Sequence, residues 1–116
     1  MILKQGVRLE AVIGAAVTTS PQAQVAYVDY GNDGVAAFPD SYRINISSTT
    51  AVVIMPAAVN AKAREILSIH IFNADSATQS TTILSNDLTT SSIYVKRPVG
   101  SISTLAFVKN AGWQVV

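Results

Sequence analysis

The segment SIHIFNADSAT, residues 68–78, holds the side chains whose types come closest to a catalytic set. His70 is the only histidine of the chain, and Asn73 and Asp75 follow shortly after it. In a catalytic triad an imidazole takes the proton of a nucleophile while a carboxylate orients the ring. No Gly-x-Ser-x-Gly turn is present, and there is neither a second histidine nor a cysteine to share a metal ion. We therefore expect His70 to be a half-buried or interfacial residue on the outer face of a sheet.

The polar residues after His70 have a simpler interpretation. Asn and Asp side chains accept hydrogen bonds from backbone groups about two residues further on and so close turns. Asn73-Ala74-Asp75 follows an alternating apolar run, where a strand would end. The sequence favours a turn here over a ligand site.

A second segment, DYGNDGVAAFPD, has the acidic spacing of a calcium loop in part. Asp29, Asp33 and Asp40 fall at positions 1, 5 and 12 of such a loop, but positions 3 and 9 are Gly31 and Ala37. We therefore expect a glycine-rich connection between strands and no metal. No glycine-rich phosphate motif leads into a helix either, so the sequence predicts no cofactor and no enzymatic activity.

The bulk composition excludes several classes of protein. With 116 residues the chain is expected to form one domain, 1–116, and without cysteine it has no disulfide framework. Eight Lys and Arg residues are scattered and give a net charge of +1, so nucleic acid is not expected as a partner. No apolar run approaches the ~20 residues of a membrane span, and charged residues interrupt the N-terminal segment where an export signal would be apolar.

Hydrophobic periodicity predicts strands throughout. Alternating runs recur every 8 to 14 residues or so between clusters of Gly, Pro, Asn and Asp, which is typical of an all-β sandwich or barrel. In the longest run, Leu67, Ile69 and Ile71 are expected on one face and Ile66, Ser68, His70 and Phe72 on the other. The one helix candidate, 57–67, lacks an N-cap and is interpreted as a loop leading into a strand.

The last residues predict a hairpin. Residues 105–108 and the segment GWQVV would pair across a turn at 109–112, where Gly112 provides a positive φ. Trp113, the only tryptophan, is expected to pack against the edge of the core.

The surface is expected to be unusually poor in charge. Hydrophobic residues make up 49% of the chain and charged residues 13%, against about 25% charged in an ordinary soluble domain. Residues 52–55 are apolar on both faces of a strand, with Val52 and Ile54 among them, so one face should meet something outside the core. We expect that contact to be a neighbouring subunit, with His70 and Phe72 as further interface or core anchors.

Three segments together resemble small virion proteins of tailed bacteriophages: GVRLEAVIGAAVTTSPQAQVAYVDY, STTAVVIMPAAVNAKAREILSIHIFNAD and GSISTLAFVKNAGWQVV. The resemblance covers most of the chain and lies in the order of the motifs. It implies a single-domain antiparallel β-sandwich of jelly-roll type, with about eight strands. It also implies a structural role as a capsid cement or decoration protein, made in the host bacterial cytoplasm and incorporated into the virion.

The same resemblance implies assembly in several copies, often as a trimer, on the major capsid protein. A position in the tail, neck or fibre, against tail proteins, is the alternative within the same family. A second alternative from the residues is a carbohydrate-binding or receptor-binding sandwich. Its platform would be formed by the aromatic residues Tyr27, Tyr30, Tyr42, Tyr94 and Trp113.

Overall fold

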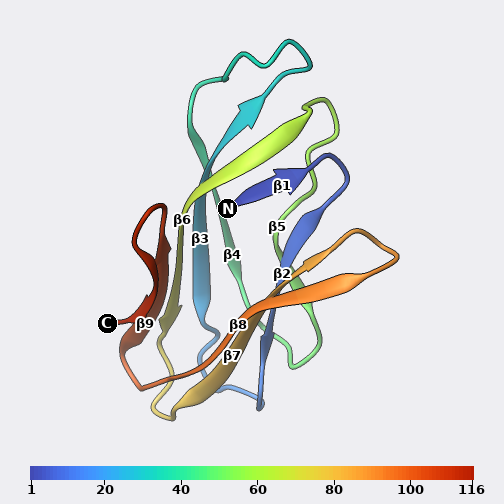
Figure 1. Ribbon diagram of the computed structural model, residues 1–116. Helices are drawn as coiled ribbons and strands as arrows, with labels where there is room; N and C mark the ends of the chain where they lie inside the picture. The colour runs from blue at the N-terminus through green and yellow to red at the C-terminus, as the bar shows by residue number, and fades with distance from the viewer.

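The computed structural model describes residues 1–116 and contains ten strands and no helix (Figure 1). The strands are β1 (Ile2–Lys4), β2 (Arg8–Ile13), β3 (Gln22–Tyr30), β4 (Asp40–Asn45), β5 (Val52–Met55), β6 (Ala63–Asn73), β7 (Gln79–Asn86), β8 (Ser91–Val99), β9 (Ser103–Val108) and β10 (Gly112–Val115). Two antiparallel sheets pack into a β-sandwich, as the sequence predicts. The count is ten strands where about eight are expected, and the three-residue β1 is too short to show any alternation.

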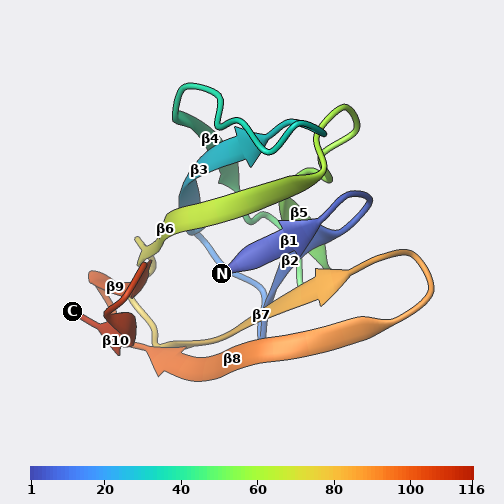
Figure 2. The ribbon, with the colours of Figure 1, turned by 45° about the horizontal axis from the view of Figure 1, so that its top comes forward.

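The first sheet has the order β10-β9-β6-β3-β4, with β1 also paired to β6. The second sheet has the order β5-β2-β7-β8. In the first sheet β3 pairs along one edge of β6. Two strands share the other edge of β6: β1 pairs with Ala63 to Glu65, and β9 pairs with Ser68 to Asn73. The turn from β1 to β2 therefore carries the chain from one sheet to the other (Figure 2).

The core lies between the sheets and is built from the inward residues of alternating strands. Leu9, Ile13, Ile69, Ile83 and Leu105 are all at most 1% exposed. Each buried side chain of this size stabilises the fold by about 1.5–3 kcal/mol relative to an exposed one. The period-2 pattern of the sequence is thus the pattern of burial in these strands.

A β-bulge in β6 overturns one prediction. Ala26 pairs with Ser68 and Tyr27 with Ile66, so Leu67 is the extra residue of β6. An extra residue in a strand reverses the face of the sheet to which the preceding side chains of that strand point. Ile66 is fully buried, and the expectation that it lies on the outward face is wrong.

A second bulge accounts for the apolar run in β5. Leu9 pairs with Met55 and Glu10 with Val53, so Ile54 is the extra residue, and Ile54 and Met55 are both buried. Val52 is half-buried against the core. Val53 is only partly buried. The expectation that a neighbouring subunit covers part of this strand stays a prediction.

The C-terminal hairpin forms as predicted. Val108 pairs with Gly112, whose φ is +79°, and Phe107 pairs with Trp113. The rings of Phe107 and Trp113 lie 5.1 Å apart, centroid to centroid, and Trp113 is half-buried at the edge of the core. The segment before Ala63 forms a loop, as expected from its missing helix cap.

Candidate functional site

His70 lies on the outer face of the first sheet. It is exposed, sits between Gln24 and Ala106 on the neighbouring strands, and its side chain makes no hydrogen bond. Phe72, two residues on, is 39% exposed on the same face. Nowhere in the chain do three or more Asp, Glu or His side chains gather at a spacing suited to a metal ion.

Asn73 faces the opposite way from His70 and is 1% exposed. Its side-chain nitrogen donates to the carbonyl oxygens of Ala77, Val99 and Gly100 at 2.8, 3.0 and 3.1 Å. Its side-chain oxygen accepts the N–H of Asp75 at 3.1 Å. This one amide ties the β6–β7 turn to the end of β8, so the predicted turn is present and its role is structural.

Asp75 completes the same cluster. It is 5% exposed, and its carboxylate accepts the backbone N–H groups of Thr18 at 3.0 Å and Ser76 at 2.7 Å. These hydrogen bonds favour the ionised form and hold the pKa of Asp75 below its usual value. The carboxylate thereby fixes the β2–β3 connection against the β6–β7 turn.

Replacing Asp75 by Asn is expected to remove a pH-dependent part of the stability. An Asp ionises near pH 3.9 in an unfolded chain, and the pKa of Asp75 lies lower in the fold. The ionised carboxylate therefore stabilises the folded protein above that pH, and the contribution is lost as the pH falls through the unfolded and then the folded value. The difference in unfolding free energy between wild type and variant should be largest above about pH 5 and shrink toward pH 3. Urea denaturation at a series of pH values measures it, and a difference that does not change with pH would contradict the assignment.

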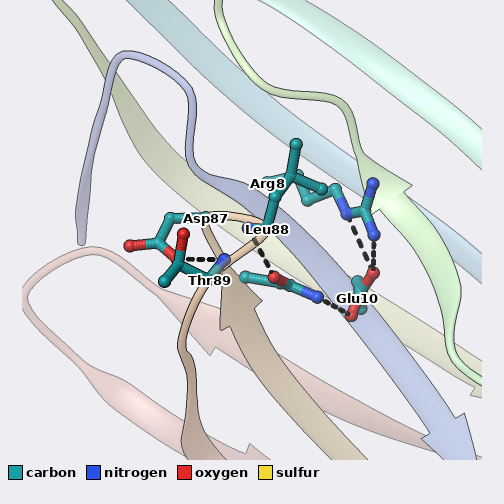
Figure 3. Close-up of polar contacts among 6 residues, drawn as sticks. Arg8, Glu10, Asp87, Leu88 and Thr89 are labelled. Carbon is teal, nitrogen blue, oxygen red and sulfur yellow. Dashed lines mark hydrogen bonds and ion pairs between the residues drawn. The ribbon is translucent and has the colours of Figure 1, made fainter.

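Figure 3 shows a second polar cluster, at the turn of the β7–β8 hairpin. Glu10 is 4% exposed, its Oε2 accepts Arg8 Nε at 2.8 Å and lies 2.7 Å from Arg8 Nη2, and its Oε1 accepts Asn86 Nδ2 at 3.1 Å. Asp87 accepts the backbone N–H groups of the following turn, which lower its pKa. Both carboxylates have structural partners, and neither faces a cavity.

The three acidic side chains of the calcium-like spacing each have a partner of their own. Asp29 forms an ion pair with Arg64, Asp33 accepts the N–H of Val35 at 3.0 Å, and Asp40 accepts the N–H of the residue after it at 2.7 Å. The acidic side chains are thus engaged separately, and the segment forms a loop between β3 and β4, as expected.

One cleft opens at the end of the sandwich, between the β3–β4 loop (31–39) and the β5–β6 loop (56–62). Figure 1 shows these two loops side by side at the top of the molecule. The cleft has a volume of about 460 Å³. Its lining residues come from both sheets and both loops: Tyr27, Asp29, Gly31, Ala37, Tyr42, Met55, Pro56, Ala57, Val59, Asn60, Ala61 and Arg64.

An arginine organises the polar side of the cleft. Arg64 donates from Nε and Nη2 to the two carboxylate oxygens of Asp29 at 2.7 and 2.8 Å, and from Nη1 to the carbonyl of Pro56 at 2.7 Å. Its guanidinium carbon lies 4.3 Å from the ring centre of Tyr27. The bidentate bond to Asp29 raises the pKa of Arg64 further above its already high value. The charges of this ion pair offset each other within the cleft.

The loops that form the walls are held in place by backbone bonds. The N–H of Ala37 donates to the carbonyl of Asp29 at 2.7 Å, and the N–H of Lys62 donates to the carbonyl of Tyr30 at 2.9 Å. The side chain of Gln5 donates to the carbonyl of Val59. The cleft is thus a built feature of the fold.

The residues predicted from the sequence as interface or core anchors do not line this cleft. Ile54 is in the core, Val52 packs against it, and Trp113 lies at the other edge of the first sheet. The five proposed aromatic platform residues are not gathered either. Tyr27 and Tyr42 line the cleft, but Tyr30 donates to Glu65 and Tyr94 is on the edge strand β8.

Sequence reasoning missed the cleft because no local pattern reports it. Asp29 and Arg64 meet because antiparallel pairing of β3 and β6 sets them directly opposite each other. The only signal within the sequence was the placement of charged residues near one end of each of two long apolar strands, Asp29 in β3 and Arg64 with Glu65 in β6. Without the register of β3 against β6, the sequence does not show that Asp29 and Arg64 lie next to each other.

Comparison of the chain with protein-family models, with curated proteins and with solved structures gives no match. The structure has no helix able to cross a lipid bilayer.

Proposed function

We propose that the protein is a non-enzymatic virion structural protein that acts as a capsid cement or decoration protein by binding other copies of itself and the capsid shell. The observation that carries the proposal is the number of large apolar side chains left exposed on a chain with few charges. Twelve are exposed: Ile2, Val35, Phe38, Val59, Phe72, Leu88, Ile93, Tyr94, Ile102, Val108, Val115 and Val116.

Five of these side chains lie on segments that extend from the sandwich. Val35, Phe38 and Val59 lie on the two loops around the cleft, and Leu88 and Ile93 lie on the β7–β8 hairpin. Figure 2 shows this hairpin reaching out on the side opposite the C-terminus. Apolar groups gathered on projecting segments are typical of surfaces that bind other proteins.

The outer face of the first sheet supports the same proposal. Its central residues are largely uncharged, with Gln22, Gln24, His70, Phe72 and Thr104 on adjacent strands. Charged residues are depleted at the centre of protein interfaces. A flat sheet face of this composition suits a contact between subunits or with a shell.

Native mass measurement of the purified protein tests the self-association. We expect a stable oligomer, a trimer, at micromolar concentration. A monodisperse monomer at that concentration would contradict the proposal.

Cryo-electron microscopy of particles carrying a labelled copy tests the location. Label distributed over the shell supports the cement role, whereas label confined to the tail, neck or fibres supports the alternative location.

The cleft is the observation that favours a glycan-binding role instead, because Tyr27 and Tyr42 line it beside a paired Asp and Arg. Sugar rings stack on tyrosine and accept hydrogen bonds from arginine. A glycan array should then show binding that disappears with Tyr42→Ala while the fold is retained, and an array without binding removes this candidate.

A further inference from the structure

The apolar side chain with the greatest exposure in the chain is Phe38, at 96%. It lies on the β3–β4 loop, next to Ala37, which lines the cleft. Pro39 follows it and restricts Phe38 to an extended backbone. The loop is also fixed by two hydrogen bonds: the N–H of Gly31 donates to the carbonyl of Val35 at 3.0 Å, and the N–H of Val35 donates to the carboxylate of Asp33 at 3.0 Å. Phe38 is therefore presented outward on an ordered loop.

The adjacent cleft is suited to a side chain of this kind. Its volume is about 460 Å³, and seven of its twelve lining residues are hydrophobic. A cavity of about 150 Å³ is enough to bind benzene. Phe38 of the same chain does not occupy the cleft, because almost all of its surface is exposed. The molecule thus carries an exposed aromatic side chain, Phe38, beside an apolar cleft. We call Phe38 the knob and the cleft the socket.

The charges of the two loops are complementary. The β3–β4 loop and the first residue of β4 carry the exposed Asp33 and Asp40 and no cation, whereas the β5–β6 loop carries the exposed Lys62 and no acid. Within the cleft, the charges of Asp29 and Arg64 neutralise each other. The β3–β4 loop forms one wall of the socket and the β5–β6 loop the other. A knob loop that enters along the β5–β6 wall of another copy therefore sets carboxylates beside an ammonium group.

We propose that Phe38 of one copy inserts into the cleft of a second copy, with Asp33 and Asp40 facing Lys62 of the receiving molecule. Each copy supplies one knob and one socket, so the contact closes reciprocally in a dimer and head to tail in a ring such as a trimer. This inference rests on the proposed self-association and names the surface that mediates it.

The test uses two variants that disable opposite halves of the contact. Phe38→Ser removes the knob, and Ala57→Trp fills the socket. Sedimentation velocity over a concentration series should show at least a 100-fold rise in the dissociation constant for each variant alone. Lys96→Ser, which truncates a long exposed side chain of β8 that does not line the cleft, is the control and should leave association unchanged. Circular dichroism verifies that each variant keeps its β structure.

Mixing the two variants provides the decisive outcome. The knob of Ala57→Trp can still enter the socket of Phe38→Ser, so an equimolar mixture should form a mixed dimer that neither variant forms alone. Lys62→Glu as a single substitution should raise the dissociation constant of self-association about tenfold at low salt and by a smaller factor at 0.5 M salt.

The possible failures are distinguishable. An oligomer that persists unchanged in Phe38→Ser would overturn the knob-and-socket contact and leave the proposed function standing. A monomeric wild type would overturn both. Glycan binding that is lost in Ala57→Trp but kept in Phe38→Ser would identify the cleft as a glycan site and so also overturn the contact.

Discussion

Replacing Asn73 by Asp is expected to lower the free energy of unfolding by about 3–5 kcal/mol, the range found when a buried charge is left without a partner. The amide nitrogen of Asn73 donates to three carbonyl oxygens from two segments of the chain. A carboxylate of nearly the same shape would place a negative oxygen against those three acceptors. Asn73→Ala, which removes the donor without adding a charge, should cost less, about 2–4 kcal/mol.

Urea denaturation followed by the fluorescence of Trp113 measures both effects. Asn45→Asp is the matched control, because Asn45 is exposed at the end of β4, and it should change the stability by less than about 0.5 kcal/mol. Equal stability of Asn73→Asp and wild type would show that the amide does not hold this turn.

Arg64→Ala is expected to destabilise the fold by about 2–4 kcal/mol, since it leaves a partly buried carboxylate and a carbonyl without their donor. The side chains of Arg64 and Asp29 are 11% and 27% exposed. Arg64→Lys keeps the positive charge but loses the planar fork and the contact with Tyr27, so it should still cost about 1–2 kcal/mol.

A double-mutant cycle with Asp29→Ala isolates the pair, and the combined variant should lose less stability than the sum of the single losses. Arg43→Ala provides the control, because Arg43 is exposed on β4 and forms no ion pair; its effect should stay within about 0.5 kcal/mol. Additive single effects would mean that Arg64 acts through packing alone.

Strand positions could be predicted from the sequence because burial in a sandwich repeats every second residue. The alternation of Leu9, Ala11 and Ile13 and the turn residues around Gly112 act locally, and the structure confirms both. The predictions fail where one inserted residue reverses a face. The bulges at Leu67 and Ile54 each depend on pairing with a distant strand, so no residue nearby in the sequence indicates them.

The candidate site was less accessible to prediction for a related reason. His70 attracted attention by its chemistry, yet it is an exposed residue on a sheet face. The cleft instead depends on loops 31–39 and 56–62 meeting at one end of the sandwich, which only the topology determines. Residue type indicates chemistry, whereas the position of a cleft is a property of the assembled sheets.

The pairing of β6 along both edges has a consequence for biosynthesis. β1, near the start of the chain, bonds to β6, and β2 bonds to β7, so the central partners of both sheets come from the second half of the sequence. At a translation rate of about 5–20 residues per second, the apolar residues of β2 and β3 leave the ribosome several seconds before those partners exist. The nascent chain therefore passes through a stage in which these apolar strands lack their partners, and a ribosome stalled before Ala63 would display an aggregation-prone half-sandwich.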